Sequence, residues 1–308
     1  MIRSFALLLI LCCPVLAQDQ DKSVTSTTNE KAPAALDDAQ LKTVAAAMKF
    51  RSIGPAFMSG RIGDVAIDHE QPNTWYVAVA SGGVWKTTNA GTTFQPIFDN
   101  QKSYSIGCVT VDPSVHSTVW VGTGENNGGR HIGFGDGAYV SHDSGKTWQH
   151  KGLKSSEHIS KILVDPRNSN VVFAACQGPL WSSGGQRGLF KSVDGGTNWK
   201  NVLSAGGKGK TEAQNKDSYT GVTDVVIDPI NPDVLYAATY QRHRNVWAIV
   251  DTGPETGVFK STDGGETWKE LTNGLPSADM GKISLQVSPQ KPNFVYATIE
   301  LNLSLIHI

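Results

Sequence analysis

The chain carries almost no net charge. Its 308 residues include 27 Lys and Arg against 28 Asp and Glu, which gives a formal net charge of -1. A nucleic-acid-binding protein needs a basic surface, so this balance argues against a nucleic-acid partner. No phosphate-binding loop, dinucleotide fingerprint or local Ser-His-Asp motif occurs either, and we expect no cofactor.

Long apolar runs are equally scarce, and the only one opens the chain. Met1–Ser4 carries one positive charge and leads into the apolar stretch Phe5–Leu16, which is followed by Ala17. This pattern is typical of a secretory signal peptide and is too short for a membrane-spanning helix. We therefore expect cleavage of residues 1–17 and export of the mature chain to the periplasm or the outside of the cell.

Cysteine is rare as well. Of the four cysteines, Cys12 and Cys13 fall within the signal peptide, which leaves Cys108 and Cys176 in apolar, strand-like runs of neighbouring repeats. An exported protein can form a disulfide, whereas two buried thiols that pack as small hydrophobic groups fit the apolar surroundings. The sequence leaves this pairing open.

The segment that follows the signal peptide has little apolar character. Residues 18–35 are polar and predict a flexible leader. Apolar residues then recur at helical spacing from Leu36 to Met48, so residues 36–59 should form a short helix and an entry segment.

Glycine, by contrast, is plentiful at 32 residues, and it recurs in a hairpin of the form Ser-x-Asp-x-Gly-x-Thr-Trp. The Asp, or Asn in the first copy, recurs at steps of 54, 51 and 69 residues. Its side chain can accept hydrogen bonds from its own turn, glycine supplies a positive φ, and the aromatic residue can pack between repeats. The structural residues are thus Asn89, Asp143, Asp194 and Asp263, with Phe94, Trp148, Trp199 and Trp268.

Two apolar strands precede each hairpin. Four short strands repeated about every 50 residues are the signature of a β-propeller. We predict an all-β propeller within residues 60–303, with about four and a half four-stranded blades. The blades are expected at 60–101, 104–155, 156–205, 218–276 and, in part, 281–300. The sequence stops after the second strand of the fifth blade, and residues 304–308 do not resemble a blade. We therefore expect a longer native protein and a non-native tail at 304–308.

Two metal-binding hypotheses are not supported by the pattern. A calcium loop would need more oxygen ligands than the hairpins contain. His142, His150 and His158 are evenly spaced but should lie at the bottom, middle and top of one blade edge. We expect no metal site.

The hairpins resemble Asp boxes, also called bacterial neuraminidase repeats (BNR), of sialidases, xyloglucanases and sortilin-type propellers. Further segments resemble long exported bacterial proteins with a sortilin N-terminal-like propeller, often labelled glycosyl hydrolases: Phe50–Pro55, Ser59–Ile62, Gly82–Thr87 and Gly122–Asn126. The resemblance covers about Met48 to Ile299. It implies the propeller fold and leaves the activity open.

The blade order also suggests where a ligand could bind. If strands A to D follow in order, the Asp boxes share one end of the propeller and the B–C loops share the other. Three B–C loops are rich in Arg, His and Trp, which suit carboxylates, peptides and sugars. Alternatively, these loops pack over the blade edges and bury their tryptophans. The candidate ligand-binding residues are Glu125, Arg130, His131, Trp181, Arg242, His243, Arg244 and Trp247.

Evidence for catalysis is weaker. Most glycosidases use two carboxylates across the scissile bond. The xyloglucanase resemblance implies a catalytic Asp just before Gly82-Gly83, but Ala80 stands there. Four other acids remain as candidates, namely Glu125, Asp136, Asp251 and Glu255, and no feature of the sequence selects a pair among them. Asp251 and Glu255 lie in a turn, where we expect them to be solvated. We therefore predict a non-catalytic scaffold that binds a peptide or glycan; the alternative is a sialidase- or xyloglucanase-like glycoside hydrolase acting on an extracellular polysaccharide.

Overall fold

The computed structural model describes residues 37–47, 61–128, 132–204 and 218–301, in two units, Met1–Gly54 and Pro55–Ile308. The predicted signal peptide (1–17), the whole predicted leader (18–35) and the tail at 304–308 lie outside these ranges. No helix within them is long and apolar enough to cross a bilayer.

The first unit contains helix α1 (Asp38–Ala47), inside the span where the sequence predicts one. Asp37 and Gln40 form a reciprocal cap at its start. The Gln40 amide donates to Asp37 Oδ1 at 2.7 Å and the Asp37 amide donates to Gln40 Oε1 at 3.1 Å. These bonds satisfy backbone donors that a helix start leaves without partners.

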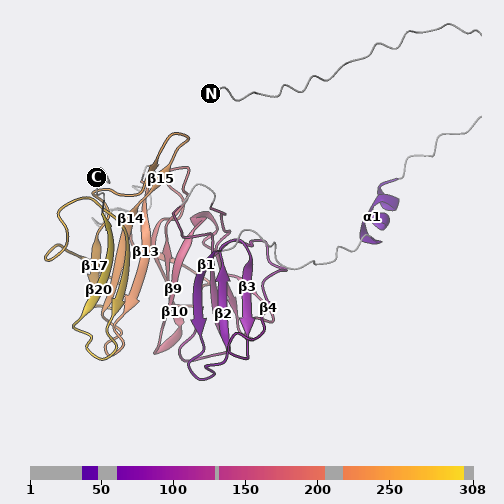
Figure 1. Cartoon of the computed structure of the whole chain (residues 1–308), viewed down its shortest axis with the longest axis horizontal. Coiled ribbons are helices and arrows are strands. Elements are labelled where there is room, and N and C mark those ends of the chain that lie inside the picture. Colours follow the sequence, from indigo (N-terminus) through magenta and orange to yellow (C-terminus); the bar gives the residue numbers. More distant parts are fainter. Residues whose placement is uncertain (1–36, 48–60, 129–131, 205–217, 302–308) are drawn as a thin grey trace, which may run out of the picture. The chain divides into compact units, whose positions relative to one another are not determined.

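The second unit consists of antiparallel sheets that follow one another along the chain (Figure 1). Blade 1 contains β1 (Ile62–Ile67), β2 (Trp75–Val79), β3 (Gly83–Thr87) and β4 (Gln95–Pro96). Blade 2 contains β5 (Ile106–Val111), β6 (Val119–Thr123), β7 (Ala138–Ser141) and β8 (Gln149–His150). A 3₁₀ turn, η1 (Lys154–Ser156), leads to blade 3, with β9 (Ile159–Asp165), β10 (Asn168–Cys176), β11 (Gly188–Ser192) and β12 (Lys200–Leu203).

Blade 4 contains β13 (Thr220–Ile227), β14 (Leu235–Gln241), β17 (Val258–Ser261) and β18 (Lys269–Leu271). A small hairpin of β15 (His243–Arg244) and β16 (Ile249–Val250) interrupts it, and β19 (Met280–Val287) pairs with β20 (Val295–Leu301) in a fifth sheet. The predicted all-β propeller architecture, with four four-stranded blades and part of a fifth, is thus confirmed.

The hydrophobic core lies between the blades. The first strands of successive blades, β1, β5, β9, β13 and β19, pack against one another in that order. One apolar cluster joins blades 1 and 2 and includes Tyr76 and Phe98 on one side and Val109 and Tyr139 on the other. Similar clusters join each later pair. Each blade therefore buries its apolar faces only against its neighbours.

The Asp-box hairpins are held by bonds within their own turns. In blade 2, Ser141 Oγ accepts from the Gly145 amide and donates to Asp143 Oδ1, both at 2.7 Å. The Thr147 hydroxyl and amide donate to Asp143 at 2.6 and 2.8 Å, and these bonds hold the pKa of the Asp143 carboxyl well below its usual range. In blade 3, bonds from Asn198 lower the pKa of Asp194 to about 2. These carboxylates are occupied by their turns, as a structural role requires.

The aromatic residue after the hairpin joins one blade to the blade before it. Trp148 Nε1 donates to the carbonyl oxygen of Ile97 at 2.8 Å, and its ring meets Phe98 edge to face at 5.0 Å. Trp199 Nε1 donates in the same way to Lys151, at 2.6 Å. In the first blade the equivalent Phe94 is 40% exposed, so this copy contributes less burial.

The two cysteines of the blades are free thiols. Cys108 and Cys176 are fully buried in the same apolar cluster between blades 2 and 3. Burial raises the pKa of Cys108 to about 12 and also raises the pKa of Cys176. Both side chains therefore pack as small hydrophobic groups.

We expect Trp148→Ala to lower the free energy of unfolding by about 2–3 kcal/mol, because it removes a half-buried indole and its bond to blade 1. Phe94→Ala, at the same position of the exposed copy, should cost less than about 1 kcal/mol. Urea-induced unfolding of the two variants and the wild type measures both losses. Equal losses would contradict the proposed role of the indole.

We expect the Cys108 and Cys176 thiols to resist alkylation in the folded chain, because only an accessible thiolate reacts. Iodoacetamide labelling at pH 8, with and without urea, followed by peptide mass spectrometry, measures the protection. Rapid labelling of either residue without urea would show that the cluster around them is open.

Candidate functional site

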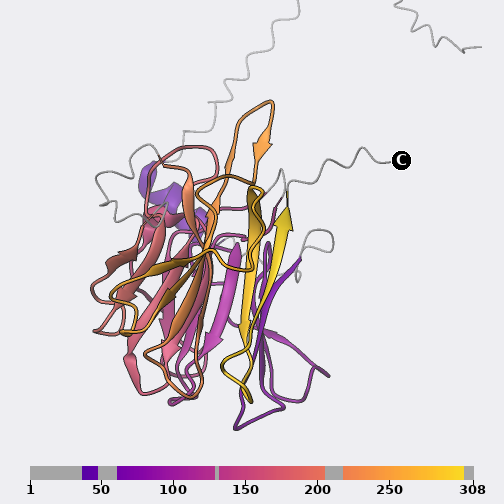
Figure 2. The same cartoon turned by 90° about the vertical axis from the view of Figure 1, so that its left-hand side faces the viewer.

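The B–C loops lie at the end of the propeller opposite the Asp boxes. They connect β2 to β3, β6 to β7, β10 to β11 and β14 to β17. The longest contains the hairpin β15–β16, which projects beyond the ends of the blade strands in both views (Figures 1 and 2). Of the predicted ligand-binding residues, Arg130 and His131 lie outside the described ranges, and the other six are on these loops.

The B–C loop of blade 3 is built around Arg187, a residue that sequence reasoning missed. Its side chain is 2% exposed and donates to five backbone carbonyls. Nε donates to Gly184 at 2.7 Å and the Nη atoms donate to Gln177, Tyr219, Ser182 and Pro179. Burial lowers the Arg187 pKa to about 10, and the cation remains charged at neutral pH. One guanidinium thus fixes the path of the loop.

The hairpin β15–β16 rests on that loop. The Arg244 amide donates to the Leu180 carbonyl at 2.8 Å, and the Arg244 guanidinium lies 5.6 Å from the centre of the Trp181 ring. In the turn of the hairpin, the amides of Trp247 and Ala248 donate to Asn245 Oδ1 at 2.9 and 2.7 Å. Sequence reasoning treated this segment as a plain loop, although Asn is a common residue for such a turn.

The two predicted tryptophans face solvent. Trp181 is 51% exposed and Trp247 is 90% exposed. We also considered that the loops bury their tryptophans over the blade edge. That expectation is wrong for Trp181 and Trp247. His243, in contrast, stacks on Tyr219 with ring centres 4.2 Å apart.

The predicted charged residues are mostly internal. Glu125 is fully buried and forms an ion pair with Arg61. Arg242 is 3% exposed and contacts the carbonyl of Asn127 at 3.4 Å, while Lys282 Nζ donates to Asn126 at 2.7 Å. Burial lowers the pKa of both cations. Residues of blades 1, 4 and 5 thus hold the start of the B–C loop of blade 2.

His158 is fully buried in the same region. Burial, followed by the charge of Arg242, lowers its pKa to about 3, so the ring is neutral at physiological pH. The even spacing of His142, His150 and His158 does not reflect a shared site. The His142 ring is hydrogen-bonded to the Thr118 hydroxyl, and the His150 ring is hydrogen-bonded to the Asp136 carbonyl. Within the described ranges, no three His, Cys, Asp or Glu side chains gather as metal ligands.

The remaining acids differ in how fully they are engaged. Asp136 accepts a hydrogen bond from the Tyr139 hydroxyl at 2.7 Å, and Glu255 accepts one from the Thr220 hydroxyl at 2.5 Å. The Asp251 carboxylate accepts no hydrogen bond from another described residue, but it lies within electrostatic reach of Arg242. The expectation that Asp251 and Glu255 are solvated is wrong in part, because both side chains are half-buried.

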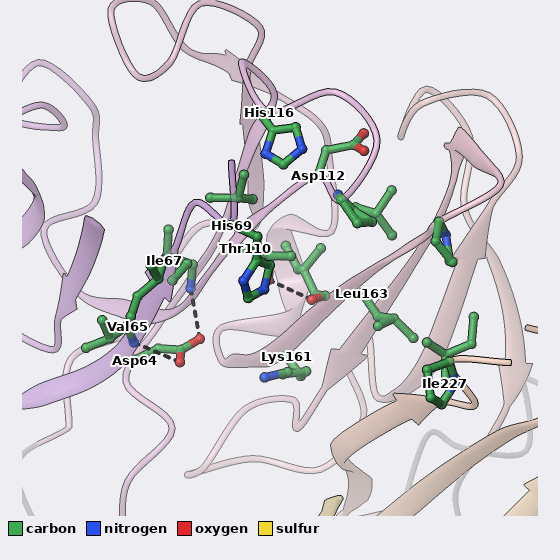
Figure 3. A pocket seen from close by; sticks show the side chains of 18 residues that line it. Asp64, Val65, Ile67, His69, Thr110, Asp112, His116, Lys161, Leu163 and Ile227 are labelled. Atoms are coloured by element: carbon green, nitrogen blue, oxygen red, sulfur yellow. Dashed lines mark hydrogen bonds between the residues drawn. The ribbon is translucent and has the colours of Figure 1, made fainter. Parts of the chain in front are cut away.

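A separate cavity of about 600 Å³ opens on the inner strands β1, β5, β9 and β13, toward the Asp-box end. Figure 3 shows Val65 and Ile67 on one side of it and Leu163 and Ile227 on the other. Asp64, also in its wall, accepts from the amides of Val65 and Val109 at 2.9 and 3.2 Å. None of the six predicted ligand-binding residues that the structure describes lines this cavity.

The propeller architecture and the Asp boxes agree with a family model. Residues 136–296, slightly more than half of the chain, match the model described as "Sortilin, neurotensin receptor 3". The chain belongs to the sortilin–Vps10 family. The resemblance inferred from the hairpins is thereby confirmed.

Curated relatives that the chain matches include xyloglucanases. The chain is 26% identical over 230 residues to a xyloglucanase of Hypocrea jecorina, covering 67% of this chain and 25% of that protein. It is also 26% identical over 236 residues to the xyloglucanase Xgh74A of Acetivibrio thermocellus, with the same coverage. This sortilin–Vps10 chain spans about a quarter of the length of the curated relatives it matches.

Solved structures show the same fold. An ancestral GH74 enzyme superposes with a TM-score of 0.58 at 23% identity, covering 80% of this chain and 28% of that one. The GH74 xyloglucanase of Xanthomonas campestris gives 0.53 at 17% identity, covering 75% and 34%.

We expect the neutral, buried His158 to make the propeller sensitive to acid. Its pKa is about 3 when folded and near 6.5 when unfolded, so the unfolded state binds an extra proton between these values. His158 therefore adds up to ~1.4 kcal/mol to the loss of unfolding free energy for each unit by which the pH falls from 6.5 toward 3. Urea titrations at pH 7, 6 and 5 should show a smaller loss in His158→Gln. The exposed His142→Gln should behave as the wild type, and identical slopes in all three would contradict the assignment.

Proposed function

We propose that this chain forms part of a glycoside hydrolase of the xyloglucanase type, whose B–C end faces an extracellular β-glucan. The similarity to two xyloglucanases across two thirds of the chain is the observation that carries this proposal. The exposed indoles at the B–C end support it, because sugar rings bind well to flat aromatic faces. The predicted signal peptide fits a polymer that is too large to enter the cell.

Asp251 is the carboxylate best suited to take part in the reaction. Glycosidases need carboxylates free to exchange a proton or attack the sugar. Glu125 is engaged with Arg61 inside the protein, and Asp136 with Tyr139. Asp251 is half-buried, and Arg242 lies within electrostatic reach of it.

A binding scaffold without hydrolysis is the second candidate. Ala80, at the position where the xyloglucanase resemblance implies an acid, is 1% exposed and cannot donate a proton. The same B–C end could then hold a glycan or a peptide without cleaving it.

We expect the chain to release reducing ends from xyloglucan, and Asp251→Asn to lower kcat at least ~100-fold with a small change in KM, because it removes a reacting group. Glu270→Gln, an exposed acid on β18, is the matched control and should leave the rate unchanged. Binding of xyloglucan without any product would overturn the hydrolase and favour the scaffold, and a full rate in Asp251→Asn would remove that residue from the mechanism.

A further inference from the structure

The two ends of the series of blades each present a side that no described blade covers. In every interblade layer, one blade packs its leading side against the trailing side of the blade before it. Blade 1 comes first in this series and the sheet of β19 and β20 comes last. Within the described residues, the leading side of blade 1 and the trailing side of the fifth sheet therefore have no partner.

The leading side of blade 1 repeats an apolar pattern that blade 2 buries. In blade 2, Ile106 and Val109 lie on this side and are at most 3% exposed, because blade 1 covers them. The strand registers give them Ile62 and Val65 as counterparts in blade 1, and these are 62% and 46% exposed. Exposed apolar side chains that gather in this way mark an interaction surface. We call the exposed apolar residues of this side the open leading face: Ile62, Val65, Ile67 and Phe94.

The trailing side of the fifth sheet exposes a tyrosine at a position where every complete blade buries an aromatic ring. Tyr296 pairs with Gln286 as Tyr76 pairs with Ala66 in blade 1, so the two tyrosines are equivalent. Tyr296 is 63% exposed, and Thr298 on the same side of the strand is also exposed. We call Gln286, Tyr296 and Thr298 the open trailing face. The equivalent rings of the four complete blades are at most 8% exposed: Tyr76, Trp120, Phe173 and Tyr236.

Two interblade layers show what such a ring contacts. Phe173 of blade 3 lies against Gly265 in the hairpin of blade 4, so closely that an added Cβ would be 2.7 Å from the ring. Trp120 of blade 2 lies against Gly196 of blade 3 in the same way, at 2.8 Å. The ring of one blade thus fits over a glycine of the next hairpin. Gly91 holds this position in the hairpin of blade 1.

We propose that the open trailing face of one copy of this chain binds the open leading face of a second copy. The contact continues the series of interblade layers across two molecules, with Tyr296 of one copy over Gly91 of the other. Because the two faces differ, the interface is heterologous, and each copy keeps a face for a further partner until the assembly closes. The net charge of -1 leaves little repulsion between copies.

This mode of association also fixes the direction of the B–C loops. A step from one blade to the next keeps these loops at one end of the propeller. A second copy joined by the same step therefore brings its own B–C end to the same side as that of the first copy. The assembly extends one loop-bearing end, whether that end cleaves a glycan or only binds it.

Sedimentation velocity over a range of protein concentrations tests the proposal. The wild type should associate, whereas Val65→Glu and Tyr296→Glu should each raise the dissociation constant at least about 30-fold, because each buries an unpaired charge in the interface. Ile230→Glu is the matched control and should associate as the wild type. Ile230 is 69% exposed in the turn between β13 and β14 and belongs to neither open face. Ile62→Glu, on the same open leading face, replaces Val65→Glu if circular dichroism shows that variant to be unfolded.

A mixture of the two variants distinguishes this interface from other modes of association. Each variant keeps one wild-type face, so the mixture should form a heterodimer that grows no further, although each variant alone is monomeric. A wild type that stays monomeric at every concentration would overturn the proposal. So would a mixture that stays monomeric, or an assembly that both variants leave intact.

Discussion

Every blade of this chain has apolar faces that only another blade can cover. The sheets are small, and they do not surround one shared hydrophobic core. The free energy gained by burying apolar side chains therefore comes from the clusters between neighbouring blades. The Asp box serves this arrangement, because it closes the last turn of a blade with internal hydrogen bonds and leaves the following indole free to enter the layer shared with the preceding blade. The B–C loops start and end on the blade strands, so the packing between the blades sets the distance between neighbouring loops.

The contrast between arginine and tryptophan defines the candidate site. In the sequence both residue types mark the B–C loops as a ligand-binding face, with guanidiniums as the charged contacts. In the structure Arg187, Arg242 and Arg244 turn inward and organise carbonyls and rings, while Trp181 and Trp247 face water. Because these guanidiniums already contact carbonyl groups and rings of the loops, the surface can recognise a ligand by its shape and apolar area more than by its charge.

The sequence predicts the parts of this structure that depend on local chemistry. Glycine at a positive φ and an Asp or Ser that bonds its own turn are properties of a few adjacent residues, so the hairpins and the blade count follow from them. Whether Glu125 and Arg242 are buried or exposed depends on partners that are distant in the sequence. These partners are Arg61 for Glu125 and Asn127 for Arg242, and no residue spacing predicts such contacts. Arg187 was missed for the same reason, since its five acceptors are ordinary backbone carbonyls.

The direction of the indole bonds has a consequence for how the chain assembles during synthesis. Trp148 bonds to Ile97 and Trp199 bonds to Lys151, so each fastens a blade that the ribosome has already released. A blade can complete its outer layer only after the next hairpin emerges, roughly 50 residues later, and at 5–20 residues per second this delay lasts several seconds. During that time the newest blade has no partner for one of its apolar faces.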